Sequence, residues 1–198
     1  MARIAATVGG VRLRLPEVSG PLDPGTRTDT AVEAAPKTLQ RLLLDVVRRV
    51  ADLPAGSSGV VVWQLGGDEL EVRTRTATLT CDEGVVTVGV QVSCDQLDAT
   101  ATVSVPLAVG TRKVPAGLVL SAFDRVLAPA LVADRWSDAL TGFAAESVLE
   151  LARVIAAASG KDSRGRPLVP GAIAAAPSRF VVQPMARFDS RVVRDGTR

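Results

Sequence analysis

The sequence predicts an α+β fold, in which an antiparallel β-meander over about residues 59–108 packs against helices over about 38–53 and 134–159. Apolar and polar residues alternate along the meander in four runs, a pattern typical of antiparallel strands with one buried face. In both helical segments, apolar residues recur every three or four positions. An N-terminal β-hairpin and an extended C-terminal arm complete the prediction.

Changes in composition along the 198 residues divide the chain into three parts. Residues 1–36 are expected to form an N-terminal hairpin and an extended connector. Residues 37–160 form a single α+β core domain, and residues 161–198 form a Pro/Arg-rich C-terminal arm. The middle part contains the layer of sheet and helices that needs no other surface.

The N-terminal hairpin is centred on the turn residues Gly9 and Gly10. Apolar residues alternate along both of its strands, and Arg12 and Arg14 interleave with the second set. Two strands alone are marginally stable in water, so this hairpin has to dock on another surface. Residues 16–36 contain four prolines and little periodicity, which indicates a connector.

The first helix is predicted over residues 38–53 and ends before Pro54 and a stretch rich in glycine and serine. We expect its apolar stripe to pack on the meander. The stripe consists of Leu39, Leu42, Leu43, Val46, Val50 and Leu53. The opposite, polar face carries Arg41, Asp45, Arg48, Arg49 and Asp52.

Three turns set the strand register of the meander, and every resulting pair lies on one apolar face. Across Gly66-Gly67 the pairs are Trp63–Leu70 and Val61–Val72. Across Glu83-Gly84 they are Cys81–Val86, Leu79–Val88 and Ala77–Val90. Across a two-residue Asp95-Gln96 loop they are Val92–Ala99, Val90–Ala101, Val88–Val103 and Val86–Val105. Threonine, serine and glutamine occupy the opposite face.

The apolar positions of the second strand change parity between Val72 and Ala77. This change predicts a β-bulge or a sharp bend within residues 73–76. Arg73 and Arg75 in this segment have two interpretations. They protect a sheet edge from unwanted pairing, which is the favoured interpretation, or they face an anionic partner.

After the meander, residues 118–120 are expected to add a fifth strand. Ser121 and Asp124 fit a capping box, which predicts a short helix towards Pro129. The clearest helical pattern covers residues 134–159 and is closed by Gly160. Its apolar stripe consists of Trp136, Leu140, Phe143, Val148, Leu151, Val154 and Ile155.

Residues 161–198 contain four prolines, and eight basic against three acidic residues give this arm +5 in a chain of net charge +2. Short apolar runs argue against a disordered tail, so the arm is expected to be held by its own domain or by a neighbouring protein. The sequence leaves both possibilities open. The candidate interaction residues are Arg12, Arg14, Arg73, Arg75, Arg179, Phe180, Val181, Val182 and Phe188.

The sequence contains no recognisable catalytic, cofactor-binding or metal-binding motif. Without histidine there is no Ser-His-Asp or Cys-His nucleophile, and two cysteines cannot supply a tetrathiolate zinc site. The predicted register keeps Cys81 and Cys94 too far apart for a disulfide. The helical carboxylate pairs Asp134/Asp138 and Glu146/Glu150 are expected to be solvated rather than metal-binding. We expect a protein that is not an enzyme and has no cofactor.

Hydrophobic residues make up 47% of the chain, yet no apolar run approaches the ~18 residues of a membrane span. The N-terminus lacks the apolar segment of a secretory signal, which favours a cytoplasmic protein. The apolar excess indicates buried subunit contacts or, alternatively, a lipid-like ligand cavity. Dispersed arginines and the absence of a recognition motif argue against nucleic-acid binding.

The order of hairpin, helix, meander and long helix resembles the helix-grip arrangement of START and polyketide-cyclase-like proteins. This resemblance implies a module for a small apolar ligand, either a carrier or a cyclase-like enzyme. Its cavity would be lined by Val88, Val90, Val103, Trp136 and Phe143.

The leading hypothesis is a non-catalytic structural or adaptor subunit of a larger assembly, a homo-oligomer or a multi-protein particle. It would bind neighbours through its terminal arms and apolar surface.

Overall fold

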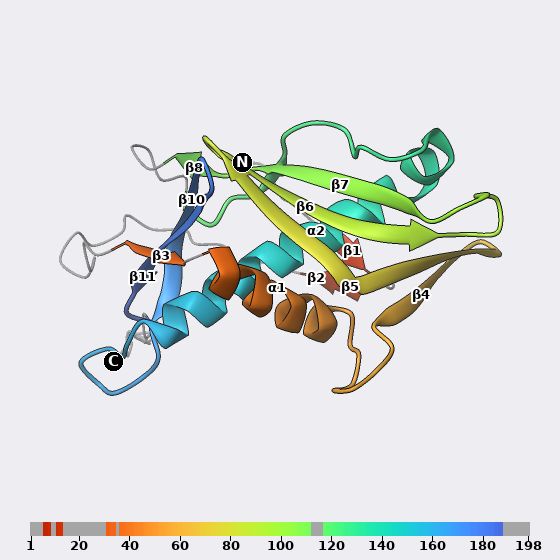
Figure 1. Ribbon diagram of the computed structural model, residues 1–198. Coiled ribbons are helices and arrows are strands. Elements are labelled where there is room, and N and C mark those ends of the chain that lie inside the picture. The colour runs from red at the N-terminus through yellow and green to blue at the C-terminus, as the bar shows by residue number, and fades with distance from the viewer. Residues whose placement is uncertain (1–5, 9–10, 14–30, 35, 112–116, 188–198) are drawn as a thin grey trace, which may run out of the picture.

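The computed structural model describes residues 6–8, 11–13, 31–34, 36–111 and 117–187. As predicted, the fold is α+β, and a five-stranded antiparallel sheet curls against two helices (Figure 1). A four-stranded sheet and the N-terminal hairpin complete it. Within the described residues, no helix is both long and apolar enough to cross a membrane.

The two helices are α1 (Pro36–Val50) and α2 (Ala130–Ala158), both close to their predicted ranges. The five-stranded sheet has the order β4-β5-β6-β7-β9, and the four-stranded sheet has the order β3-β11-β10-β8. The strands are β1 (Ala6–Val8), β2 (Val11–Leu13), β3 (Val32–Ala34), β4 (Val60–Leu65), β5 (Asp68–Asp82), β6 (Val85–Ser93), β7 (Ala101–Ala108), β8 (Gly110–Thr111), β9 (Ser121–Ala122), β10 (Val169–Ala176) and β11 (Arg179–Met185).

The predicted strand register is confirmed across Gly66-Gly67. Across Glu83-Gly84 it is confirmed for the residue pairs closest to the turn. Trp63 lies opposite Leu70 across Gly66-Gly67, where both glycines have positive φ, and Cys81 lies opposite Val86. The register across Asp95-Gln96 was wrong by two residues. Val92 pairs with Ala101, and the other three pairs shift likewise to Val90–Val103, Val88–Val105 and Val86–Leu107.

The loop between β6 and β7 explains this error. Asp95 and Gln96 do form a turn, which the Leu97 N–H closes on the Cys94 carbonyl at 3.0 Å. Cys94 and Leu97 then pack against the core, so β7 begins only at Ala101. Because the shift is an even number of residues, every side chain keeps its predicted face.

The predicted bulge in β5 is confirmed. Arg73 pairs with Gln91 and Thr78 with Gly89, so four residues of β5 lie opposite the single residue between those partners. Ala77 therefore does not pair with Val90 as predicted. The Thr76 hydroxyl accepts the Gln91 N–H at 2.9 Å and donates to the Arg73 carbonyl at 2.7 Å. A side chain thus supplies the acceptor that the interrupted ladder lacks.

The segment from Gly117 to Pro129 differs from its prediction. No strand covers residues 118–120, and Ser121 and Ala122 form β9 against β7 instead. The predicted short helix is absent here because the backbone pairs with β7: Phe123 donates to the Pro106 carbonyl, and Leu127 forms a bridge with Ser104. The Asp124 carboxylate accepts the Arg125 N–H rather than capping a helix.

The C-terminal arm was predicted as extended, but residues 169–185 of it form the hairpin β10–β11 in the four-stranded sheet. β11 lies between β10 and β3, while β10 also pairs in parallel with β8. The turn of this hairpin is tied to the five-stranded sheet, since the Ser178 N–H donates to the Cys81 carbonyl at 2.9 Å. The hairpin therefore packs on its own chain.

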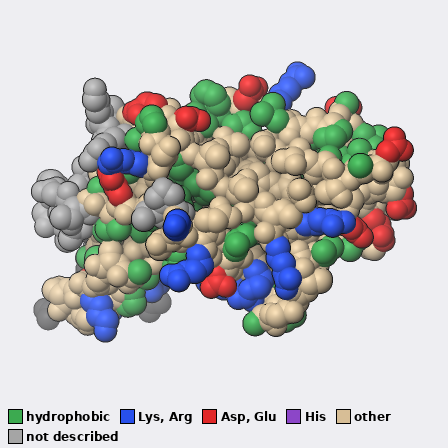
Figure 2. All heavy atoms as spheres, in the orientation of Figure 1, with side chains coloured by type: hydrophobic (Ala, Val, Ile, Leu, Met, Phe, Trp, Pro, Cys, Tyr) green, Lys and Arg blue, Asp and Glu red, His purple; other side chains and the backbone are tan. Residues whose placement is uncertain are grey.

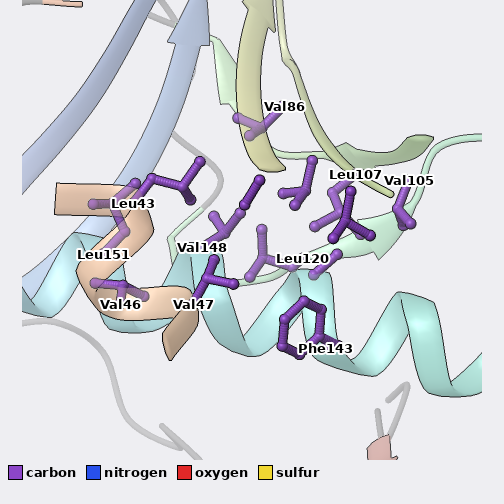
Figure 3. Close-up of a cluster of buried hydrophobic side chains, with 14 of the residues drawn as sticks. Leu43, Val46, Val47, Val86, Val105, Leu107, Leu120, Phe143, Val148 and Leu151 are labelled. Carbon is purple, nitrogen blue, oxygen red and sulfur yellow. The ribbon is translucent and has the colours of Figure 1, made fainter. Parts of the chain in front are cut away.

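The core lies around α2, which is buried on more than one side. Side chains from α1, α2 and the sheet point toward one another in Figure 3, among them Leu43, Leu107 and Leu151. Trp63 of β4 meets Phe143 of α2 edge to face, with ring centroids 5.4 Å apart. β10, β11 and the N-terminal strand β1 also contact α2.

We expect Phe180→Ala to destabilise the protein by about 3–5 kcal/mol, because Phe180 is fully buried and its removal leaves a cavity. The matched variant Phe123→Ala removes the same ring at a position that is 62% exposed, and should change stability by less than about 0.5 kcal/mol. Urea unfolding of both variants measures the difference. Equal losses would contradict the packing of β11 on its own chain.

Candidate interaction surfaces

Four candidate interaction residues of the C-terminal arm make contacts within their own chain. Phe180, Val181 and Val182 are buried, because β11 is an interior strand, and Phe180 and Val182 enter the core. Arg179 is half-exposed and forms a 2.8 Å ion pair with Glu33 of β3. The three apolar residues therefore pack within the fold of the chain, and Arg179 pairs with a neighbouring strand of the same sheet.

The side chains of three other candidate interaction residues lie outside the described part of the structure. Arg14 and Phe188 lie outside the described residues. Arg12 belongs to β2, where its backbone pairs with Thr7, and its side chain is outside the described part.

The residues expected to line a helix-grip cavity are all packed in the core. Val88, Val90 and Val103 of the sheet and Trp136 and Phe143 of α2 are each no more than 4% exposed. Two clefts of the described structure lie elsewhere, and neither is lined by any of these five.

The larger cleft, which we name the basic cleft, lies between α1, the loop after it and the bulged part of β5. It has a volume of about 610 Å³ and is open to solvent on one side. Its lining consists of Arg41, Leu42, Leu44, Asp45, Arg48, Gly56, Ser57, Gly59, Thr74 and Arg75. Figure 2 shows Lys and Arg side chains gathered over α1 and the adjoining strands, with few acidic groups among them.

The first wall of the basic cleft is the polar face of α1. Leu43, Val46 and Val47 are fully buried against the core, which turns Arg41 and Asp45 outward. Three lining arginines stand against a single carboxylate, so the cleft carries an excess of two positive charges. The Arg48 and Asp45 side chains are 3.5 Å apart, at the long end for a hydrogen bond.

The second wall is the loop that closes α1. Asp52 takes a positive φ of 53°, and its N–H and that of Leu53 bond back to the carbonyls of Arg49 and Arg48. This pattern is a Schellman motif with an aspartate at the position that usually holds glycine. The Arg48 guanidinium donates to the Leu53 carbonyl at 3.0 Å, which fixes its place at the cleft.

The third wall is the bulge of β5. The buried Thr74 donates to the Gly59 carbonyl through both its N–H, at 2.7 Å, and its hydroxyl, at 2.9 Å. The Arg75 guanidinium donates to the Ser57 carbonyl. Its aliphatic part crosses Gly59 so closely that a Cβ there would lie 2.5 Å from Cγ of Arg75.

The placement of the bulge arginines bears on their two interpretations. Beyond Arg73 the β5 edge is covered, because Gln40 of α1 donates to the Ala77 carbonyl and Ser178 donates to that of Cys81. Little free strand edge is therefore left beyond Arg73 for these arginines to protect. Arg75 lines the basic cleft, whereas Arg73 does not.

The smaller cleft contains one of the carboxylate pairs considered as a cation site. The Glu150 carboxylate forms ion pairs with the guanidinium groups of Arg49, at 2.9 Å, and Arg153, at 3.4 Å. Its negative charge is therefore neutralised by arginines from both helices. Burial raises the pKa of Glu146, an effect that Arg153 opposes and Glu150 reinforces. Among the described residues, no cluster of three potential metal ligands occurs.

An apolar strip, defined as Val119, Phe123, Leu127 and Leu131, lies along the β9 edge of the five-stranded sheet. These side chains are 62%, 62%, 60% and 48% exposed. Phe123 and Leu127 run beside β7, and Leu131 is in the first turn of α2. Val62 and Leu65 are similarly exposed on β4, at the opposite edge of the same sheet.

We expect Asp52→Gly to stabilise the protein by about 0.5–1 kcal/mol, because glycine adopts the positive φ at this position without steric cost. Asp45→Gly, the same replacement inside α1, should destabilise it by about 0.3 kcal/mol. Urea unfolding midpoints would measure both. Shifts of the same sign would argue against the Schellman closure of α1.

The two cysteines are unpaired, as predicted, and should differ in reactivity. Burial, reinforced by the charge of Asp82, raises the pKa of Cys81 to about 12, so at pH 8 only about one thiol in ten thousand is ionised. Iodoacetamide at pH 8 should modify the half-exposed Cys94 and spare Cys81 until the protein is unfolded. Peptide mass spectrometry checks this, and equal modification of both in native protein would contradict it.

The chain was compared with known proteins at three levels. No protein-family model, curated protein or solved structure matches it. Its function therefore has to be inferred from its own residues and geometry.

Proposed function

We propose that this protein is a non-catalytic structural or adaptor subunit of a larger protein assembly, and that it binds its neighbours through apolar surface. The observation that carries this proposal is the apolar strip. Large apolar side chains exposed along one edge of a sheet are suited to contact with another protein. The buried β10–β11 hairpin takes no part in the proposed interface.

The strip has the composition of an interface centre. Phe123 is an aromatic residue of the kind enriched at the centre of interfaces, and Leu127 follows it along the same edge. Figure 2 shows hydrophobic side chains gathered over the segment that joins β9 to α2. Arg125 and Asp124 are exposed between them and would form part of a polar rim.

The opposite edge supports the same function. Among the described residues, β4 has a strand neighbour only on its β5 side, and its sequence VVVWQL contains neither charge nor proline. Charged residues and prolines are the features that usually prevent a free strand edge from pairing with another chain. An unguarded six-residue edge can accept a strand from a neighbour through backbone hydrogen bonds.

Two arguments favour a subunit over a catalyst or an apolar-ligand carrier. The sequence has no histidine and no catalytic motif. The side chains that a helix-grip cavity would require are packed against one another in the core. The ligand-binding alternative therefore has no observation in its favour at the sheet–helix interface.

We expect the whole chain to self-associate at micromolar concentration, and the double variant F123S/L127S to shift it to the monomer. Removing two interface anchors should weaken association by at least about 30-fold. Size-exclusion chromatography with light scattering over a range of concentrations measures this change. Urea unfolding should show native stability, because both side chains are exposed.

The comparison variant is V62S/L65S, which makes the same kind of change on β4, the second candidate contact edge. It should leave self-association through the strip intact. If only V62S/L65S gave the monomer, β4 would be the interface and the strip would lose its assigned role. A native chain that stays monomeric at every concentration would contradict the proposed self-association.

A further inference from the structure

We propose that the basic cleft is a binding site for a small molecule that carries phosphate groups. The cleft is distinct from the apolar strip, and the chemistry of its lining differs. It combines three arginines from two elements with a short apolar wall, and its volume of about 610 Å³ falls within the range of small-molecule pockets.

The arginines retain donors for a ligand. A guanidinium has five N–H donors, and the protein uses few of them here. Arg41 forms no hydrogen bond or ion pair with the described part of the chain. Arg48 and Arg75 donate to carbonyls of the adjoining loop, and the carboxylate of Asp45 is 3.5 Å from Arg48. Two excess positive charges therefore face the cleft.

The site is held in place before any ligand arrives. The loop from Leu53 to Gly59 is fixed to α1 by the Schellman closure and to β5 by the two bonds of Thr74. The Arg75 side chain lies across Gly59 and is anchored on Ser57. A preordered site loses less conformational entropy on binding than flexible surface arginines would.

Phosphate is the anion that best fits this lining. The planar guanidinium fork matches phosphate oxygens in a two-bond geometry that ammonium groups cannot provide. The Ser57 hydroxyl oxygen is buried at the edge of this lining without a hydrogen-bond partner in the described structure. Leu42 and Leu44 offer an apolar wall to an uncharged part of the ligand. The lining includes no aromatic ring, so stacking of nucleic-acid bases is not supported.

Isothermal titration of the whole chain with inorganic pyrophosphate tests the proposal. We expect one site per chain, with an affinity that falls as salt is added. Arg41→Gln and Arg75→Gln should each weaken binding by about tenfold or more, since each removes charge-assisted hydrogen bonds. Arg75→Lys should recover only part of the loss, because it restores the charge without the fork.

The control is Arg164→Gln, which removes one positive charge from an exposed residue outside both the cleft and the apolar strip and should change the affinity by less than about twofold. Thermal melting without ligand verifies that every variant is folded. Absence of pyrophosphate binding at millimolar concentration would overturn the proposal. So would equal losses in Arg41→Gln and Arg164→Gln, or binding of a glutamate-rich peptide in place of pyrophosphate.

Discussion

Burial of α2 is the constraint on which the rest of the structure depends. A helix at the surface of a domain buries one stripe, but α2 buries side chains toward several neighbours. The five-stranded sheet and α1 cover part of it, and β10, β11 and β1 cover other parts. No single layer could shield all of these positions, which is why segments from both ends of the chain are drawn onto one helix.

The meander could be predicted because its information is local. Two glycines at the first turn and the alternation on either side of each turn specify pairs near the turns. The parity change in β5 likewise predicted the bulge. The longer loop before β7 could not be predicted, because it depends on Cys94 and Leu97 finding space in the core. Burial of this kind is a property of the assembled layers rather than of the local sequence.

The C-terminal hairpin was missed for a different physical reason. Prolines usually exclude a segment from a sheet, yet Pro170 lies opposite Pro184, and the register shifts directly after Pro170. The run of alanines in β10 also hides the period of two, since alanine occupies both faces. Long-range pairing with β3 and β8 then stabilises what local sequence does not specify.

The basic cleft shows how far sequence reasoning could reach toward a site. Arg75 was identified from the bulge, but Arg41 and Arg48 were assigned only to a polar helix face. Nothing in their spacing indicates that a loop and a bulged strand meet them in space. The aspartate at the positive-φ position after α1 was similarly invisible, because glycine is the residue by which such a closure is recognised.

The position of β11 between β3 and β10 affects how the chain folds during its synthesis. One neighbour of β11 precedes α1, whereas β11 itself is translated after every other described strand and helix. While the ribosome is still extending the polypeptide, the matching side of α2 has no cover and β3 has no partner. The apolar surface exposed in that interval is a natural substrate for chaperones. A product released early by a premature stop codon would keep that surface open permanently, and cellular proteases would find it readily.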